Sequence, residues 1–509
     1  MRFLYISLLS FFVLSTSCKK YLDVKPKGKL IPSEIADFDH LLDNTNIVQW
    51  TFTDNNLGCM LGYMTDNIYL SDPIGKIYYK ANNHPNIDRY YGYIFREPYK
   101  NPTFSDYFWE WGTYRSMAYF NNVIDGVNSV RNSGNGSDAD AVIAQALVDR
   151  AWSYFHTALV FGPVYKPGGN NSTKVLPYLT SSDVSAPMPD LSTTDEVFAK
   201  VAQDLYAALP AIPAVTKYPS RPNKAAAQAM LAYYHLFTQK YDSVVYYANL
   251  AWTSATAGGV DKVLYDYNTL SLSDPANPLT SPIKSPDNLI QLPSSREMLL
   301  FRYPDNGAGL SASSYPSPEF INLFDQANDL RFRFFLLTGP GYKTTFNGTT
   351  YDDGQQIQYY RGASATGGYP KTQMTCGFTY PELLLMRAEG YARTNKLAQA
   401  IADLNTLRKY RYKTGTPDLT VGTQDQVIAQ VLDERRRELP LGQIKRFLDL
   451  KRFCLEPTKP WGKTKISHTL GGVTYDGTID SHTFILPIPN TVLQFNPSWG
   501  IPLDTRPFN

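Results

Sequence analysis

Cysteine is scarce in this chain, with four residues among 509 and no pair spaced as Cys-x-x-Cys. Setting aside Cys18, the odd number left (Cys59, Cys376 and Cys454) argues against both a disulfide framework and a zinc site. We therefore expect three free, buried thiols.

An excess of charge of one sign is also absent. Lys and Arg number 48 and Asp and Glu 46, so the formal net charge is +2. Nothing in this balance indicates a nucleic-acid partner, because such proteins usually carry a basic field. Beyond residue 17, no stretch approaches the ~18 uninterrupted apolar residues of a membrane-spanning helix. We expect that part of the chain to be soluble.

The common catalytic motifs are missing as well. The sequence contains no HExxH, GxSxG, Walker or GxGxxG motif, and its six histidines are scattered. A pair of carboxylates for glycoside hydrolysis meets only in the folded protein, so a glycosidase stays an alternative. The sequence favours a protein without catalytic residues.

Aromatic residues, in contrast, are abundant. The chain has 37 Tyr, 26 Phe and 7 Trp, together 14% of its residues. Tyrosine combines a flat apolar face with a polar tip, which suits stacking on sugars or gripping peptides. Most of these tyrosines are nevertheless expected to pack between helices.

The N-terminus reads as an export signal over residues 1–17. Phe3 to Leu14 form an apolar stretch too short to span a membrane, and small residues then precede Cys18. A signal that ends directly at Cys is typical of lipoproteins, although Leu14 lies one position further from Cys18 than usual. We expect Cys18 to be lipidated and residues 18–32 to form a tether.

Helical periodicity dominates most of the remaining chain. Ser137-x-x-Asp140 and Thr193-x-x-Glu196 resemble capping boxes. Short turns join the helices into pairs like tetratricopeptide units, with small residues such as Ala232 and Gly390 at the expected contacts. Helices are predicted over 33–42, 108–130, 141–161, 193–209, 223–237, 242–252, 381–394, 397–410, 427–439 and 444–453.

Two long segments, 46–106 and 257–370, and the tail 454–509 lack this periodicity. Long irregular inserts in a compact protein are usually functional loops. Sugar sites need flat aromatic faces together with planar hydrogen-bonding groups. The ligand-binding candidates in the two inserts are Tyr63, Asp66, Asn67, Tyr69, Tyr78, Tyr91, Arg302, Tyr303 and Tyr315, and the alternative is that they pack against the helices.

Two charged motifs point to structure instead of chemistry. The run Glu434 to Glu438 places three arginines between carboxylates, and helical spacing makes it an ion-pair lattice. Asp352-Asp353-Gly354 contains carboxylates that could bind a structural calcium ion, but the sequence has no EF-hand spacing. No other metal and no cofactor is expected.

Six segments, taken in order, resemble the SusD/RagB family of surface nutrient-binding lipoproteins of Bacteroidetes. They are Cys18-Lys19-Lys20-Tyr21-Leu22-Asp23, Ala151–Phe155 with Phe161–Val164, Lys224–Leu236, Tyr380–Glu389 with Ala398–Arg408, Glu434–Leu439, and Leu486–Pro489 with Asn496-Pro497. Two details depart from the family pattern. Pro440-Leu441-Gly442 stands where the family usually has Phe-Glu-Gly, and Arg446–Leu450 stands where it has Trp-Phe-Asp-Leu.

This resemblance implies an all-α, SusD-like fold over residues 33–509, with four tetratricopeptide-type helix pairs and a loop-rich part that carries the ligand site. It also implies a SusC-like TonB-dependent transporter as partner and a lipid-anchored position on the outer membrane, exposed at the surface. The expected function is capture of an oligosaccharide or polysaccharide and its delivery to that transporter. A surface glycosidase, a peptide-binding member of the family and a protein-binding scaffold are the alternatives.

Overall fold

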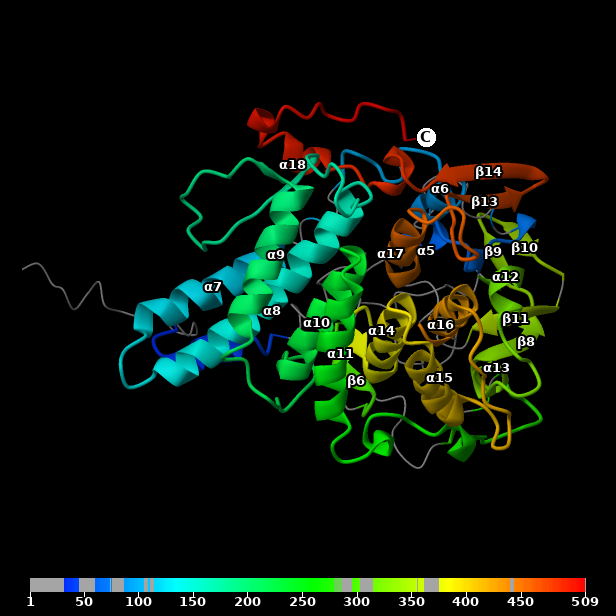
Figure 1. The fold of residues 1–509 in the computed structure, drawn as a ribbon. Helices are drawn as coiled ribbons and strands as arrows, with labels where there is room; N and C mark the ends of the chain where they lie inside the picture. Colours follow the sequence, from blue (N-terminus) through cyan, green and yellow to red (C-terminus); the bar gives the residue numbers. More distant parts are fainter. Residues whose placement is uncertain are drawn as a thin grey trace, which may run out of the picture.

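The computed structural model describes residues 32–44, 60–73, 75, 87–104, 109, 114–279, 281, 283–284, 295–302, 315–354, 375–439 and 444–508, and the backbone of 356–360 (Figure 1). Cys18, Cys59, Tyr78 and Tyr303 lie outside these residues. Among the described residues, no helix is both long and apolar enough to cross a membrane.

A helical scaffold forms most of the described structure. Its helices are α7 (Arg115–Val130), α8 (Gly136–Phe161), α9 (Thr194–Ala208), α10 (Lys224–Phe237), α11 (Tyr241–Ala255), α14 (Tyr380–Arg393), α15 (Leu397–Arg411), α16 (Gln424–Glu438) and α17 (Ile444–Phe453). Neighbours in sequence pack together: α7 on α8, α8 on α9, α10 on α11 and α14 on α15. The predicted all-α fold of tetratricopeptide type is confirmed.

Local signals set several helix ends. The predicted capping box of α9 is present: Thr193 accepts a hydrogen bond from the Glu196 amide (3.2 Å), and the Glu196 carboxylate accepts one from the Thr193 amide (2.7 Å). The predicted box at Ser137 is wrong, because α8 already begins at Gly136 after a turn in which the Asn132 amide donates to the Asn135 side chain (2.7 Å).

Small residues allow the helices to approach closely, as predicted. Ala232 is fully buried in α10. At Gly390 in α14, an added Cβ would lie 2.9 Å from the Val245 side chain of α11. This close contact packs the pair α14 and α15 against the pair α10 and α11. Cys376 and Cys454 are buried thiols and take part in no disulfide, as expected.

The inserts and the tail contain more regular structure than predicted. The described elements there are α5 (Met60–Tyr63), β1 (Ile68–Tyr69), α6 (Ile87–Tyr93), β4 (Ser271–Leu272), β5 (Ile283–Lys284), β6 (Met298–Leu300), β7 (Tyr315–Pro316), α12 (Pro318–Ile321), α13 (Leu330–Phe335), β8 (Leu336–Pro340), β9 (Lys343–Phe346), β10 (Thr349–Asp352), β11 (Gln356–Tyr360), β13 (Lys465–Leu470), β14 (Val473–Thr478) and α18 (Asn490–Leu493). Irregular segments still separate these short elements, as predicted, and the β13–β14 hairpin in the tail is the clearest element that the sequence analysis missed. The two-residue strands β1, β4, β5 and β7 are invisible to periodicity, because they contain no repeat.

The remaining described elements are α3 (Ile35–Leu41), β2 (Lys174–Pro177), β3 (Leu191–Thr193), β12 (Phe378–Thr379) and the short 3-10 helices Val260–Lys262, Tyr267–Thr269, His482–Phe484 and Pro497–Trp499. The strands pair two by two, and every pair is antiparallel: β1 with β7, β2 with β3, β4 with β5, β6 with β12, β8 with β11, β9 with β10 and β13 with β14. Figure 1 shows β8 to β11 and β13 to β14 gathered at one end of the molecule, beside α12, α13 and α16. The scaffold thus presents short hairpins at that end.

Candidate functional site

The two inserts meet at the short sheet formed by β1 and β7. Tyr69 lies opposite Tyr315 in the register, with 6.4 Å between their ring centroids. Ser317 ties the segments further: its amide donates to the Asn67 carbonyl (2.8 Å) and its hydroxyl to the Asp66 carbonyl (2.6 Å). Four predicted candidates from separate inserts are therefore brought together.

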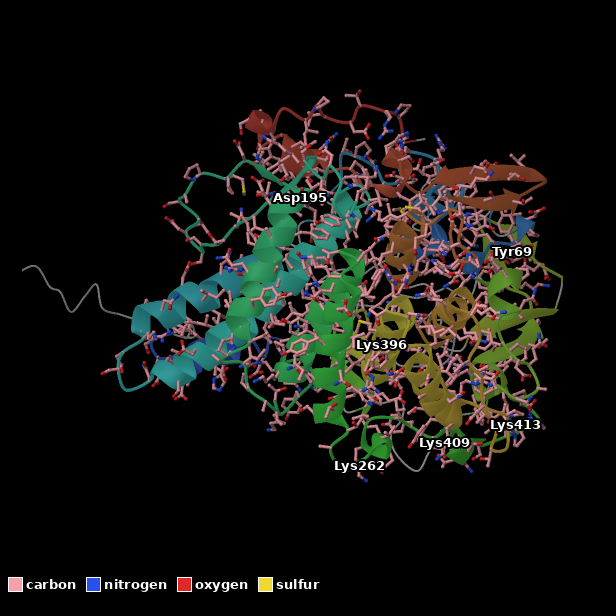
Figure 2. All side chains as sticks on the ribbon, viewed as in Figure 1. Tyr69, Asp195, Lys262, Lys396, Lys409 and Lys413 are labelled. Atoms are coloured by element: carbon pink, nitrogen blue, oxygen red, sulfur yellow. The ribbon has the colours of Figure 1, made fainter. Side chains whose placement is uncertain are left out.

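Tyr69 is the exposed member of this group, with 37% of its surface accessible. Beneath it, the buried Tyr315 hydroxyl donates to the Asp353 carboxylate, and the Ser71 hydroxyl donates to the other oxygen of the same carboxylate. The Tyr342 amide donates to the Tyr315 hydroxyl oxygen (2.8 Å). We call Tyr69, Ser71, Asp72, Tyr315 and Asp353 the Tyr69 surface, and Figure 2 shows Tyr69 at the end that carries the hairpins.

The Tyr69 phenol stays neutral around physiological pH. Partial burial raises its pKa, and the nearby carboxylates of Asp72 and Asp353 raise it further. A neutral phenol can both donate and accept a hydrogen bond. Asp72 is exposed and accepts from the Gly471 amide (2.7 Å), which brings the turn between β13 and β14 to the same surface.

Asp66 and Asn67 anchor the segment that precedes Tyr69. Arg446 holds both carboxylate oxygens of Asp66 (2.8 and 2.7 Å), and Arg436 donates to the Asn67 side chain (2.6 Å). Burial would raise the pKa of Asp66, but Arg446 and Arg436 hold it well below its ordinary value. Because both residues are buried, their described contacts are with the protein, and contact with a ligand stays a prediction.

The run Glu434 to Glu438 is an ion-pair lattice, as predicted. Its partners come from five other elements and from both inserts: Arg435 contacts Glu382 (3.1 Å) and Asp449 (2.8 Å), Arg436 contacts Asp66 (3.3 Å) and Glu319 (2.7 Å), Arg437 contacts Glu434 (2.7 Å), Arg331 contacts Glu434 (2.7 Å) and Glu438 (2.8 Å), and Arg411 contacts Glu438 (2.7 Å). The lattice therefore fixes the inserts to the scaffold.

Three other candidates lie in the protein interior. Tyr63 is 1% exposed, and the Tyr91 hydroxyl donates to the Phe508 carbonyl (2.9 Å). Arg302 is buried in an ion pair with Asp149. These positions give the three side chains packing roles, and a role in binding stays a prediction. Tyr78 and Tyr303 fall outside the described residues.

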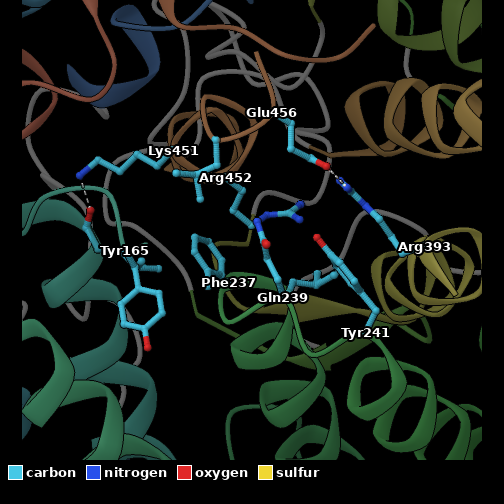
Figure 3. Close-up of a pocket in the computed structure, with 11 residues that line it drawn as sticks. Tyr165, Phe237, Gln239, Tyr241, Arg393, Lys451, Arg452 and Glu456 are labelled. Atoms are coloured by element: carbon cyan, nitrogen blue, oxygen red, sulfur yellow. Dashed lines mark hydrogen bonds and ion pairs between the residues drawn. The ribbon is translucent and has the colours of Figure 1, made fainter. Parts of the chain in front are cut away.

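A small, partly open cavity lies between the turn joining α10 to α11 and the helices α8, α14 and α17 (Figure 3). Its lining includes Gln239, Tyr241, Arg393 and Arg452, and it leaves about 10 Å³ for the centre of a water molecule. Such a space holds roughly one water and no sugar ring. Among the described residues, the open Tyr69 surface therefore suits a glycan better than this cavity does.

Lys451 contributes to the lining of the same cavity. Its ammonium donates to the carbonyls of Leu159 (2.6 Å) and Gly162 (2.9 Å), at the end of α8. Burial lowers the pKa of Lys451 to about 7. The bonds to the last carbonyls of a helix indicate a capping role for this side chain.

Within the described ranges, no three His, Cys, Asp or Glu side chains are grouped as metal ligands. Asp352 pairs instead with Lys343 (2.8 Å), and Asp353 accepts from two hydroxyls. A calcium ion at this turn stays a prediction.

Acid should unfold the protein through its buried lattice. Burial would raise the pKa of Glu434 and Asp449, but neighbouring arginines lower both to about 2, from ordinary values of 4.5 and 3.8. A carboxyl with a depressed pKa stabilises the fold above its ordinary pKa, and this contribution is lost as the pH falls. We expect the free energy of unfolding to fall steeply between pH 4.5 and 2, measured by urea titration. A flat profile over this interval would contradict the expectation.

Two family models match the chain. One, described as starch-binding and associating with the outer membrane, matches residues 20–236, and the model of the SusD family matches residues 321–499. The chain belongs to the SusD/RagB family. The two matches leave out residues 237–320, which include α11 and the first part of the second insert.

Solved structures of SusD proteins share the fold. A SusD superfamily protein from Bacteroides thetaiotaomicron VPI-5482 is 19% identical, with a TM-score of 0.62 over 91% of this chain and 98% of that one. A putative sugar binding protein from Bacteroides vulgatus ATCC 8482 is 15% identical, with a TM-score of 0.61 over 92% and 98%. A SusD-like carbohydrate binding protein from the same organism is 15% identical, with a TM-score of 0.59 over 92% and 97%. No curated protein sequence matches.

Several residues of the Tyr69 surface were missed by sequence reasoning. Ser71 and Asp72 follow Tyr69 by two and three positions, in a Ser-Asp-Pro motif typical of a turn. Asp353 was noted only as a calcium candidate. Its role beneath Tyr69 depends on a contact with Ser71, 282 positions earlier in the chain, for which the sequence holds no signal.

Proposed function

We propose that this SusD-family protein holds an oligosaccharide or polysaccharide at the outer cell surface and delivers it to a SusC-like TonB-dependent transporter. The observation that carries the proposal is the exposed Tyr69 ring, fixed over a buried hydrogen-bonded base where the two inserts meet. The family description, starch-binding and associating with the outer membrane, supports the same function.

The chemistry of the Tyr69 surface suits a sugar ring. The aromatic face of Tyr69 would cover the apolar side of a pyranose, and the exposed Asp72 carboxylate would accept from vicinal hydroxyls. Asp353 already accepts from two hydroxyls, which engages both of its oxygens. These bonds hold Asp353 in place beneath the Tyr69 ring. Release of shortened glycans separates the glycosidase alternative from binding without turnover.

Replacing Tyr69 with alanine is expected to weaken glycan binding roughly tenfold or more, because stacking and the buried apolar area are both lost. Tyr69→Phe keeps the ring and should retain most of the affinity. Calorimetry or affinity electrophoresis against a panel of glycans and peptides would measure both variants. If the wild type binds only peptides, the peptide-binding alternative is correct, and release of shortened glycans would favour a glycosidase.

A pull-down from outer membranes tests the delivery step. The proposed function predicts that a large β-barrel transporter is recovered with the wild-type protein. Recovery of no such partner from cells grown on a glycan that the protein binds would argue against delivery while leaving capture intact.

A further inference from the structure

A buried carboxylate without a cation beside it distinguishes the Tyr69 surface. Buried carboxylates of the lattice face arginines, as Glu434 and Asp449 do. Among the described residues, the buried Asp353 carboxylate accepts from two hydroxyls instead. A charge is usually buried only with a partner of opposite sign, because its transfer out of water is costly. The negative charge of Asp353 is therefore left uncompensated beneath the Tyr69 ring.

The hydrogen bonds around Asp353 fix it as an acceptor. The Tyr342 amide donates to the Tyr315 hydroxyl oxygen (2.8 Å), so the phenolic hydrogen is left to point at Asp353. The Ser71 hydroxyl donates to the other carboxylate oxygen. Hydroxyl donors stabilise a carboxylate without cancelling its charge. The site thus keeps a fixed negative charge under its binding face.

A second carboxylate lies at the edge of the same surface. Asp72 is exposed, and it accepts from the Gly471 amide (2.7 Å), a donor without a full charge. Lys343, in the hairpin that ends just before Asp353, pairs with Asp352 (2.8 Å). Within the described part of the chain, neither Asp72 nor Asp353 forms an ion pair. Two unbalanced carboxylates therefore flank the ring that would stack on a sugar.

We propose that the Tyr69 surface selects uncharged glycans and discriminates against polysaccharides that carry carboxylates or sulfates. This inference rests on the proposed function of the surface and adds the class of substrate. A sugar stacked on Tyr69 would bring its substituents close to Asp72 and Asp353. Neutral hydroxyls would donate to the accessible carboxylate of Asp72, whereas anionic groups would be repelled by both charges.

The experiment compares two derivatives of one glycan in calorimetry with the full-length protein. The probes are the hydroxyethyl and carboxymethyl forms of starch, cellulose, inulin and any further glycan of the panel that binds. Both forms carry a short ether substituent, and the second adds a carboxylate. For a bound glycan, we expect the hydroxyethyl form to bind about tenfold more tightly at low salt. In about 1 M NaCl, screening should reduce this ratio to roughly twofold or less.

Two matched variants locate the charge that sets the ratio. Asp72→Asn keeps an oxygen for the Gly471 amide but removes one charge, so the ratio should fall to about threefold, whatever the affinities themselves do. Asp195→Asn removes the same charge from the first turn of α9, which lies well away from Tyr69 in Figure 2. This control should leave the ratio unchanged, because the charge is far from the ring.

The outcomes separate the inference from the proposed function. Equal affinity of the wild type for the two forms, or tighter binding of the carboxymethyl form, would overturn the inference and leave glycan capture intact. A ratio that persists at high salt, or that Asp72→Asn does not change, would show rejection by shape and overturn it as well. If the wild type binds no glycan in either form, the proposed function fails together with the inference.

Discussion

Replacing Glu434 with glutamine is expected to destabilise the protein by about 3–5 kcal/mol, the usual cost of breaking a buried ion pair on one side. The Glu434 carboxylate is fully buried and contacts Arg331 (2.7 Å) and Arg437 (2.7 Å). Glutamine fills the same space but is neutral, so two buried guanidinium groups would lose a compensating charge. Urea-induced unfolding at pH 7 would measure the change in free energy.

Glu319→Gln is the matched control for this prediction. Glu319 also pairs with the same charged run, through Arg436 (2.7 Å), and with Lys463 (2.7 Å), but half of its side chain is exposed. Exposed ion pairs contribute about 0–1 kcal/mol, so this variant should unfold nearly like the wild type. Equal destabilisation by the two variants would show that burial does not determine how much an ion pair of the lattice contributes to the free energy of unfolding.

The lattice explains how a helical scaffold can present a precise surface made of short strands. Small two-stranded sheets are marginally stable by themselves. Here α13 is held through Arg331, and the segment before β1 is held through Asp66. Binding groups are most precise when rigid elements support them. We infer that the charged run serves the Tyr69 surface by fixing both of its inserts to α16.

The scaffold could be predicted from the sequence because its helices are long and periodic. The predicted helix over 444–453 matches α17 at both ends, and the boxes and caps at Thr193 and Asn223 fix the starts of α9 and α10. The start of α8 was predicted wrongly because the turn before it contains several consecutive polar residues that could each cap the helix. Ser137 was favoured as a cap, but the chain had already turned at Asn135.

One missed hairpin did leave a signal in the sequence. In β13, buried and exposed side chains alternate from Lys465 to Leu470, and the following Gly471 and Gly472 both have positive φ, as a tight hairpin turn requires. The pairing of β1 with β7 left no signal in the sequence. Each of these strands has only two residues, which is too short to show an alternating pattern, and Ile68 pairs with Pro316. Only the folded chain specifies that contact.

The candidate site was predictable in composition but not in exposure. Tyr63 and Tyr69 occur six positions apart in the same Tyr- and Asn-rich stretch, yet Tyr63 is 1% exposed and Tyr69 is 37% exposed. Tyr63 ends the buried helix α5, whereas Tyr69 lies in a strand whose side chains alternate between faces. Residue type alone cannot separate a packing tyrosine from a binding one.

Replacing Cys18 with serine is expected to release the protein from the outer membrane. Serine has no thiol to receive lipid, and each acyl methylene buried in a bilayer contributes about 0.8 kcal/mol, so loss of the acyl chains removes the whole anchor. Fractionation of cells that lack the transporter would measure the membrane-bound share, because there the lipid is the expected attachment. Labelling with a fatty acid would show whether lipid is added.

Cys454→Ser is the matched control, because Cys454 is a buried free thiol and burial raises its pKa to about 12, which keeps it unreactive. This variant should remain in the membrane fraction and take up the label. If Cys18→Ser stays membrane-bound in the same cells, another part of the protein provides the attachment. If the wild type takes up no label, the signal is an ordinary cleaved one, and capture at the cell surface would then depend on the transporter alone.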